Sequence, residues 1–148
     1  MEQRSDRNWT ELLQELRVMQ TGVQILTGFL LTLPFQQRFS QLATYQHVWY
    51  LTLVLLAAFT TGLAVAPVAM HRALFRKHLK ARLVTAGDRM TRTALLLLAG
   101  LVTGLVGFIF DVVVGTVAGV VTAAITLVVL VGLWAVWPAL VELRAEPR

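Results

Sequence analysis

The segment that decides the fold is "TALLLLAGLVTGLVGFIFDVVVGTVAGVVTAAITLVVLVGLWAVW", residues 93–137. Asp111 is its single charged residue, and Gly115 divides it into two apolar runs, 93–114 and 116–137. A transmembrane helix needs about 20 mostly apolar residues, so each run predicts one span. Glycine adopts backbone angles that other residues avoid, so Gly115 permits a tight turn. The segment therefore predicts an antiparallel hairpin of two spans.

Two earlier apolar runs, 18–35 and 47–70, are also long enough to cross a membrane. The composition agrees, with 57% hydrophobic and 14% charged residues, against about half and a quarter in globular domains. None of the runs alternates as a barrel strand does. We predict an all-α polytopic membrane protein, a four-transmembrane-helix bundle over 18–138. Cytoplasmic tails are predicted at 1–17, which is amphipathic, and at 139–148.

The basic residues predict the orientation. With both termini inside, twelve of the 13 Lys and Arg fall in cytoplasmic segments and only Arg38 falls outside. Cytoplasmic loops carry such an excess, so we expect both termini in the cytoplasm and a multi-pass protein of the plasma membrane. The net charge of +5 is then a sign of topology. No nucleic-acid partner is expected.

Amphipathic helices are predicted next to the spans. Asn8 is a plausible N-cap for a surface helix that leads into the first span. The second span is predicted to continue to Gly87 as a C-cap, with Asp88 as the N-cap of the third. The basic face of this inner loop is expected to contact anionic lipid head groups. That face comprises Arg72, Arg76, Lys77, Lys80 and Arg82.

The first outer loop carries apolar residues at helical spacing, which predicts a helix lying flat in the membrane interface. These residues are Phe35, Phe39, Leu42 and Tyr45. His47, Trp49 and Tyr50 follow at the same depth, as an aromatic belt would.

A polar stripe runs along the first span. A helical wheel places on one side Arg17, Gln20, Thr21, Gln24, Thr27, Gly28 and Thr32. Such a stripe does not belong against lipid, so it should face protein, water or an identical helix. Two interpretations stay open. The stripe lines a route for ions or water, or it hydrogen-bonds to another helix and sets the packing.

Asp111 is the only acid well inside an apolar run. A carboxylate there can bind a cation or carry a proton, and it can also reach water or cap the next helix. Arg38 and His47 are its candidate partners on the outer side. Glycines at close-packing spacing flank it, suiting either the hairpin or an oligomer interface. They are Gly100, Gly104, Gly107, Gly115 and Gly119.

No catalytic motif is present, and the chain has no cysteine. We expect neither an enzyme nor a metal or other cofactor, since His71 and His78 have no further ligand nearby. Two functions fit the pattern. One is a homo-oligomeric channel or transporter for a small cation or proton. The other is a non-transporting accessory or scaffold subunit of a larger membrane complex.

The stretches "ELRVMQTGVQILTGFLLTLPFQQRF" (15–39) and "YLTLVLLAAFTTGLAVAPVAMHRALFR" (50–76) resemble a family of small four-span membrane proteins of high-GC Gram-positive bacteria. The family is a domain of unknown function whose members are sometimes labelled sodium:proton antiporters. The resemblance implies four spans. Large antiporters use buried carboxylates, often in broken helices with inverted repeats, whereas this chain has Asp111 alone.

Overall fold

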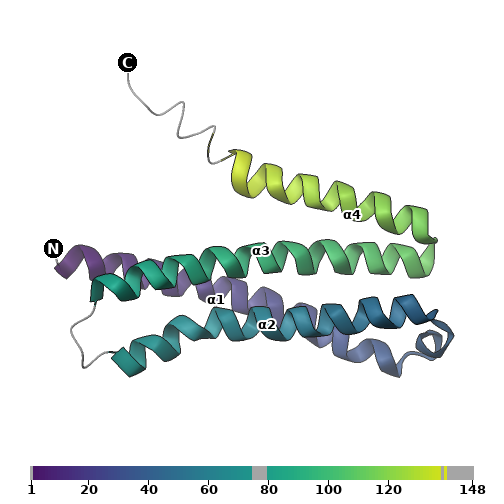
Figure 1. Ribbon diagram of the computed structural model, residues 1–148, viewed down its shortest axis with the longest axis horizontal. Coiled ribbons are helices and arrows are strands. Elements are labelled where there is room, and N and C mark those ends of the chain that lie inside the picture. Colours follow the sequence, from purple (N-terminus) through teal and green to yellow (C-terminus); the bar gives the residue numbers. More distant parts are fainter. Residues whose placement is uncertain (1, 75–79, 138, 140–148) are drawn as a thin grey trace, which may run out of the picture. The chain divides into compact units, whose positions relative to one another are not determined.

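The computed structural model describes residues 2–74, 80–137 and 139, and within these it is helical with no strand (Figure 1). The all-α prediction is confirmed. Two short 3-10 helices separate the first two long helices, and a π-helical segment extends the last. The elements are α1 (Glu2–Thr32), η1 (Leu33–Phe35), η2 (Gln37–Gln41), α2 (Thr44–Leu74), α3 (Lys80–Val113), α4 (Thr116–Val131) and η3 (Gly132–Val136).

Four helices are long and apolar enough to cross a membrane, which indicates a multi-pass membrane protein. The candidate spans are Gln14–Phe35, Thr44–Pro67, Arg89–Val113 and Thr116–Val136. The first three begin three or four residues earlier than predicted, and the fourth begins at the predicted residue. The difference arises because a helix continues into the polar residues beside an apolar run, each added residue forming one more backbone hydrogen bond.

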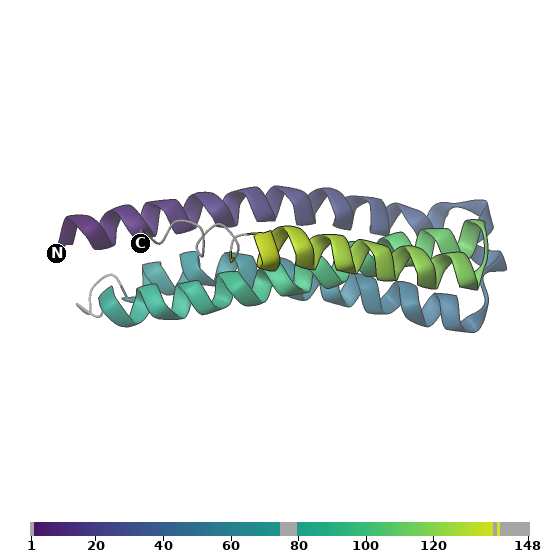
Figure 2. The same ribbon diagram turned by 90° about the horizontal axis from the view of Figure 1, so that it is seen from above.

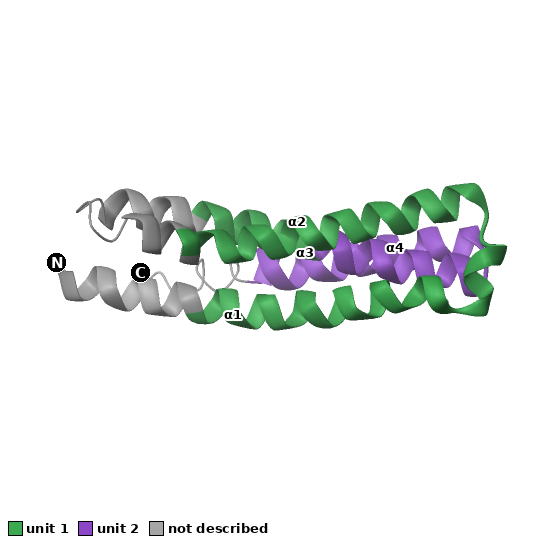
Figure 3. Ribbon diagram, turned by 90° about the horizontal axis from the view of Figure 1, so that it is seen from below, with its two compact units in different colours: residues 1–98 green, residues 99–148 purple. Residues whose placement is uncertain are grey.

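The chain forms two compact units, Met1–Leu98 and Ala99–Arg148 (Figure 3). In the first unit, α1 and α2 run antiparallel (Figure 2). Three helices contribute to one small core there, with Leu16 and Met19 from α1, Ala64 from α2 and Ala94 from α3. The alanines add little volume, so the helix backbones can approach closely, as in other membrane helix contacts.

The turn between α1 and α2 is shaped by Pro34 and Gln46. Pro34 lies at the start of η1 and cannot donate a backbone hydrogen bond, so the α-helix ends at Thr32. The Ala43 backbone N–H donates to Oε1 of Gln46 at 2.9 Å. This is the side-chain half of a capping box, and it helps to fix where α2 begins.

The second unit contains the end of α3, Gly115 and α4. Gly115 has a φ of 131°, and its N–H donates to the carbonyl of Phe110 at 3.1 Å. Four residues into α4, a Cβ atom built on Gly119 would lie 2.8 Å from the Gly107 carbonyl oxygen and 2.8 Å from Cβ of Asp111. The predicted hairpin is therefore confirmed, and Gly119 is a point of close contact between its two helices.

Three predicted helix boundaries are wrong. α1 begins at Glu2, so Asn8 lies inside the helix. The described part of α2 reaches Leu74, and α3 runs without a break through Gly87 and Asp88, so neither residue is a cap. A glycine inside a helix costs about 1 kcal/mol. Ending the helix there would leave several backbone groups without intrahelical partners, so continuing through Gly87 is the less costly solution.

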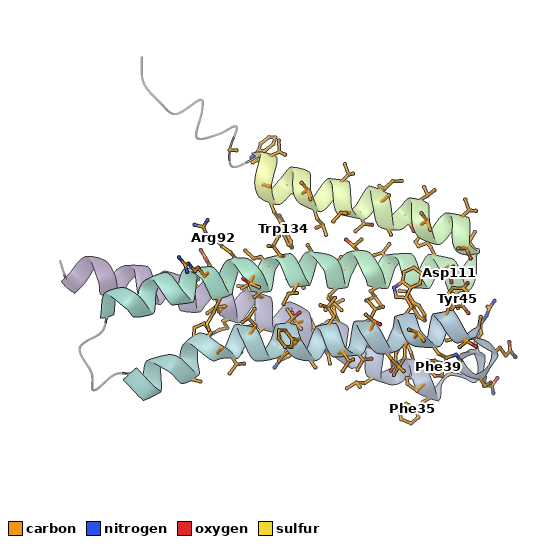
Figure 4. The ribbon with its side chains drawn as sticks, in the orientation of Figure 1. Phe35, Phe39, Tyr45, Arg92, Asp111 and Trp134 are labelled. Carbon is orange, nitrogen blue, oxygen red and sulfur yellow. The ribbon has the colours of Figure 1, made fainter. Side chains whose placement is uncertain are left out.

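The predicted flat helix in the first outer loop is also wrong. Phe35 is 88% exposed and points away from the helices (Figure 4), whereas Phe39 is half-buried. The Phe39 ring packs edge-on against the rings of His47 and Tyr50, each with a centroid distance of 5.0 Å. Tyr50 is buried, so it does not belong to a lipid-facing aromatic belt. The short 3-10 helices turn the chain so that the Phe39 ring faces inward while the Phe35 ring faces outward.

Candidate functional site

The polar stripe of α1 divides into half-buried and exposed residues. Gln20 and Thr27 are half-buried, and the exposed members are Thr21, Gln24, Gly28 and Thr32. The three threonines donate to carbonyls of their own helix, at 3.1 Å to Arg17, 2.7 Å to Val23 and 2.7 Å to Phe29. Their hydroxyl protons are therefore satisfied within α1. The glutamines are the stripe residues that still need a partner.

Gln24 has the most demanding position of the stripe. It lies ten residues after Gln14 and eleven before Phe35, which is about 15 Å from either end of the span. Its side chain is exposed and has no hydrogen-bond partner among the residues that the structure describes. An amide left without partners in hydrocarbon costs about 4–8 kcal/mol. Something other than acyl chains must therefore cover it.

Asp111 is buried, with 4% of its surface exposed. It lies in the last turn of α3, close to the hairpin turn (Figure 4). A Cβ atom at Gly119 would come within 3.1 Å of Cα of Asp111. Because Gly119 has no side chain, the α4 backbone reaches the carboxylate-bearing turn of α3 directly. The hairpin therefore encloses the acid between two closely spaced backbones.

Thr103 is a polar group of the hairpin that sequence reasoning missed. Its Oγ1 is buried and has no hydrogen-bond partner among the described residues. Thr122 and Thr126 on α4 instead bond to carbonyls of their own helix, at 2.8 Å to Ala118 and 2.8 Å to Thr122. The signal was available in the spacing, because residues 103, 107 and 111 follow one another at four-residue steps.

Those steps place Thr103 and Asp111 on one face of α3, with Gly107 between them. Gly107 is the residue whose carbonyl faces Gly119 of α4. This face of α3 therefore carries a buried acid, a close backbone contact and an unpartnered hydroxyl. The acid and the hydroxyl are eight residues apart, which is about 12 Å along the helix.

The predicted partners of Asp111 lie in the other compact unit. Arg38 is exposed at η2. His47 is half-buried, with Nδ1 3.1 Å from the carbonyl oxygen of Ala43 and its ring against Phe39. His47 therefore has a local role in the turn between α1 and α2. Their pairing with Asp111 stays a prediction.

The side chains of the predicted lipid-binding residues lie outside the part of the chain that the structure describes. Arg76 and Lys77 lie outside the described residues. Arg72 belongs to the last turn of α2, and Lys80 and Arg82 to the start of α3, by their backbones. Contact of this basic segment with head groups therefore also stays a prediction.

Tyr50 completes a hydrogen bond that Pro34 removes. The carbonyl of Leu30 stands four residues before Pro34, which has no N–H to donate to it. The Tyr50 hydroxyl donates to that carbonyl at 3.0 Å, and both residues are buried, at 5% and 0% exposure. The bond ties the end of α1 to the first turns of α2. It holds the α1 stripe in a fixed rotation relative to α2.

Comparison with known proteins identifies the family. The model of a family of unknown function, DUF6328, matches residues 1–138, and the chain belongs to that family. No curated protein and no solved structure matches the chain.

Proposed function

We propose that this member of DUF6328 is a subunit of a homo-oligomeric channel or transporter for a proton or small cation, inserted in the plasma membrane with both termini in the cytoplasm. The observation that carries the proposal is the burial of Asp111 in a membrane-spanning helix. Ionisable residues at such positions are costly and usually mark ion pathways or proton relays. No enzymatic activity is part of the proposal.

Asp111 supplies the charge in this scheme. A carboxylate can exchange a proton or contribute oxygen ligands to a small cation. Its position near the hairpin turn puts it close to one membrane surface, predicted to be the outer one. An ion that enters there meets Asp111 before it reaches the apolar middle of the span.

Thr103 supplies the next polar group. Its hydroxyl can donate and accept, and it is not used by the described residues around it. A buried hydroxyl without a partner is costly. Such a group persists in native proteins where it has a use, and water or an ion that passes along the face of α3 gives it one. The proposal therefore names Asp111 and Thr103 as two polar groups of one route along α3.

The described part of one chain offers few ligands for this task. Among the residues that the structure describes, no three of His, Cys, Asp or Glu come together. Further copies of the chain would supply additional ligands to the ion. This argument supports the oligomeric part of the proposal.

The test measures ion flux in proteoliposomes with a pH-sensitive dye or a cation-sensitive dye inside. Asp111→Asn keeps the size of the side chain and removes its charge. Thr103→Val keeps the shape and removes the hydroxyl. Glu15→Gln is the matched control, because it makes the same chemical change as Asp111→Asn at an exposed acid at the start of a different span, Gln14–Phe35.

We expect Asp111→Asn to abolish flux, Thr103→Val to lower it, and Glu15→Gln to leave it unchanged. Thr103→Val should not destabilise the fold, because it removes a hydroxyl that has no described partner. Loss of flux with unchanged stability separates a role in transport from a role in folding. Wild-type flux no higher than that of empty liposomes would refute the proposal.

The second candidate is an accessory subunit of a larger membrane complex, and the exposed amide of Gln24 favours it. A helix of another protein can cover that amide as well as a water-filled path can. This function predicts a partner that co-purifies from native membranes and is lost when Arg76, Lys77 and Lys80 are changed to Gln. Robust flux by the purified chain alone would count against it.

A further inference from the structure

The exposed face of α1 has a repeat of its own. Thr21, Gln24, Gly28 and Leu31 are all exposed, and they follow one another at steps of three, four and three residues. We call these four residues the α1 seam. Alternating steps of three and four give the 3.5-residue period of a left-handed helix pair. Arg17 continues the period toward the water, where its long side chain can reach the head groups.

The seam lies apart from the face that α1 uses inside its own unit. Leu16, Met19, Val23 and Leu30 are the buried residues of α1. On a helical wheel they centre about 100° or more from the seam. α1 therefore has two contact faces, one occupied by its own chain and one exposed.

A second copy of the chain is the occupant that this seam suits. Copies with the same orientation in the membrane place their α1 helices parallel, so a two-fold axis brings each seam residue opposite itself. A primary amide both donates and accepts, so Gln24 can satisfy Gln24 of the second copy. One amide residue in a heptad seam also sets register and oligomeric state in coiled coils.

Gly28 stands one turn beyond Gln24. A Cβ atom built there has nothing within 4 Å, so no contact among the described residues requires a glycine at this position. A glycine on a membrane helix surface lets a second backbone approach closely. We propose that the α1 seam is the interface of a parallel homodimer, with the Gln24 amides hydrogen-bonded to each other across a two-fold axis and Gly28 at the close approach.

This inference deepens the proposed function by naming the partner surface of the oligomer. It assigns the polar stripe of α1 to packing and leaves the ion path to α3 and α4. Dimer formation is measured without reference to flux, so either proposal can fail while the other stands.

The first experiment uses single-cysteine variants, which are clean because the chain has no natural cysteine. The reconstituted protein is oxidised at Thr21→Cys, Gly28→Cys and Leu31→Cys. Ile25→Cys and Phe29→Cys are matched controls at the same depths, since these residues are 57% and 66% exposed but lie off the seam. We expect disulfide dimers to form faster at the seam positions than at the control positions, because two Cβ atoms come within bonding distance on the seam.

The second experiment measures the dimer fraction against dilution in lipid. Gly28→Leu should disrupt the dimer, whereas Gly62→Leu on α2 should not, although a side chain at either glycine meets nothing within 4 Å. Gln24→Leu should raise the dissociation constant about 3- to 30-fold, the effect of losing an interhelical hydrogen bond in a membrane. Gln24→Asn should retain part of the affinity, because it keeps an amide.

The inference would be supported by faster cross-linking at the seam positions than at the control positions, together with loss of the dimer in Gly28→Leu and its retention in Gly62→Leu. Equal cross-linking at seam and control positions would overturn it. So would a dimer that tolerates Gly28→Leu. If seam cross-links form and no flux is measured, the dimer stands and the transport proposal fails.

Discussion

Replacing Tyr50 by Phe tests how the turn between α1 and α2 is held. The substitution removes one oxygen atom and leaves the ring in contact with Phe39. The lost group is the donor to the Leu30 carbonyl, at 3.0 Å. Because Pro34 provides no N–H, that carbonyl also lacks its normal helical donor.

The expected cost follows from the burial of both residues. A buried acceptor that loses its partner costs about 1–3 kcal/mol. The carbonyl is inside a membrane span, so water is a poor substitute and we expect the upper half of that range. Thr52→Val is the matched control, because its exposed hydroxyl donates to a carbonyl of its own helix at 2.8 Å. That change should cost less than about 0.5 kcal/mol.

A double-mutant cycle then tests the cause. Pro34→Ala restores a backbone N–H at the position that serves the Leu30 carbonyl. In that background, Tyr50→Phe should cost at least about 1 kcal/mol less than in the wild type. The free energy of unfolding is measured by titration of the reconstituted or micelle-bound protein with SDS and followed by circular dichroism. An equal cost of Tyr50→Phe in both backgrounds would refute the reasoning.

Three further changes test the turn and the hairpin. Gly119→Ala should destabilise the protein by about 1–3 kcal/mol, since its Cβ would lie 2.8 Å from a backbone oxygen that cannot move aside. The control Gly132→Ala, where nothing lies within 4 Å, should be neutral or slightly stabilising. Equal unfolding midpoints for the two variants would contradict the close contact. Gly115→Ala should cost about 1–3 kcal/mol, because φ of 131° is strained for any side chain, and thermal unfolding that is unchanged would argue against this turn. Gln46→Ala should cost about 0.5–2 kcal/mol through loss of the bond from the Ala43 N–H, seen as faster amide exchange at Ala43.

The sequence was sufficient to predict the spans and the hairpin, because both depend on local features of the chain. Apolar runs of membrane length have few alternatives to a helix, because every backbone group must be paired within the segment. Gly115 is readable because a turn between two such runs needs an unusual backbone angle. The helix ends were less predictable. Gly87 and Asp88 carry capping preferences worth about 1 kcal/mol, less than the cooperative gain of one long helix.

The sequence was enough to identify the unusual residues of the candidate site, but not the residues that they contact. Asp111 and Gln24 stand out in sequence because charged and amide groups are rare in spans. Whether Gly119 meets Asp111, and whether Tyr50 serves Leu30, depends on helix rotation and register. Helix rotation and register follow from the packing along the whole length of two helices, which no short motif encodes. Thr103 was overlooked for the same reason, since most membrane threonines bond to their own helix.

The most direct test of the account is a count of active vesicles as a function of protein copies per vesicle. The wild-type chain is reconstituted at low density, and proton or cation flux is recorded from single vesicles. A homo-oligomer predicts that vesicles with one copy are silent, so the active fraction follows the probability of receiving two copies or more. An active fraction that follows the probability of receiving one copy, or the absence of active vesicles at any density, would contradict the account.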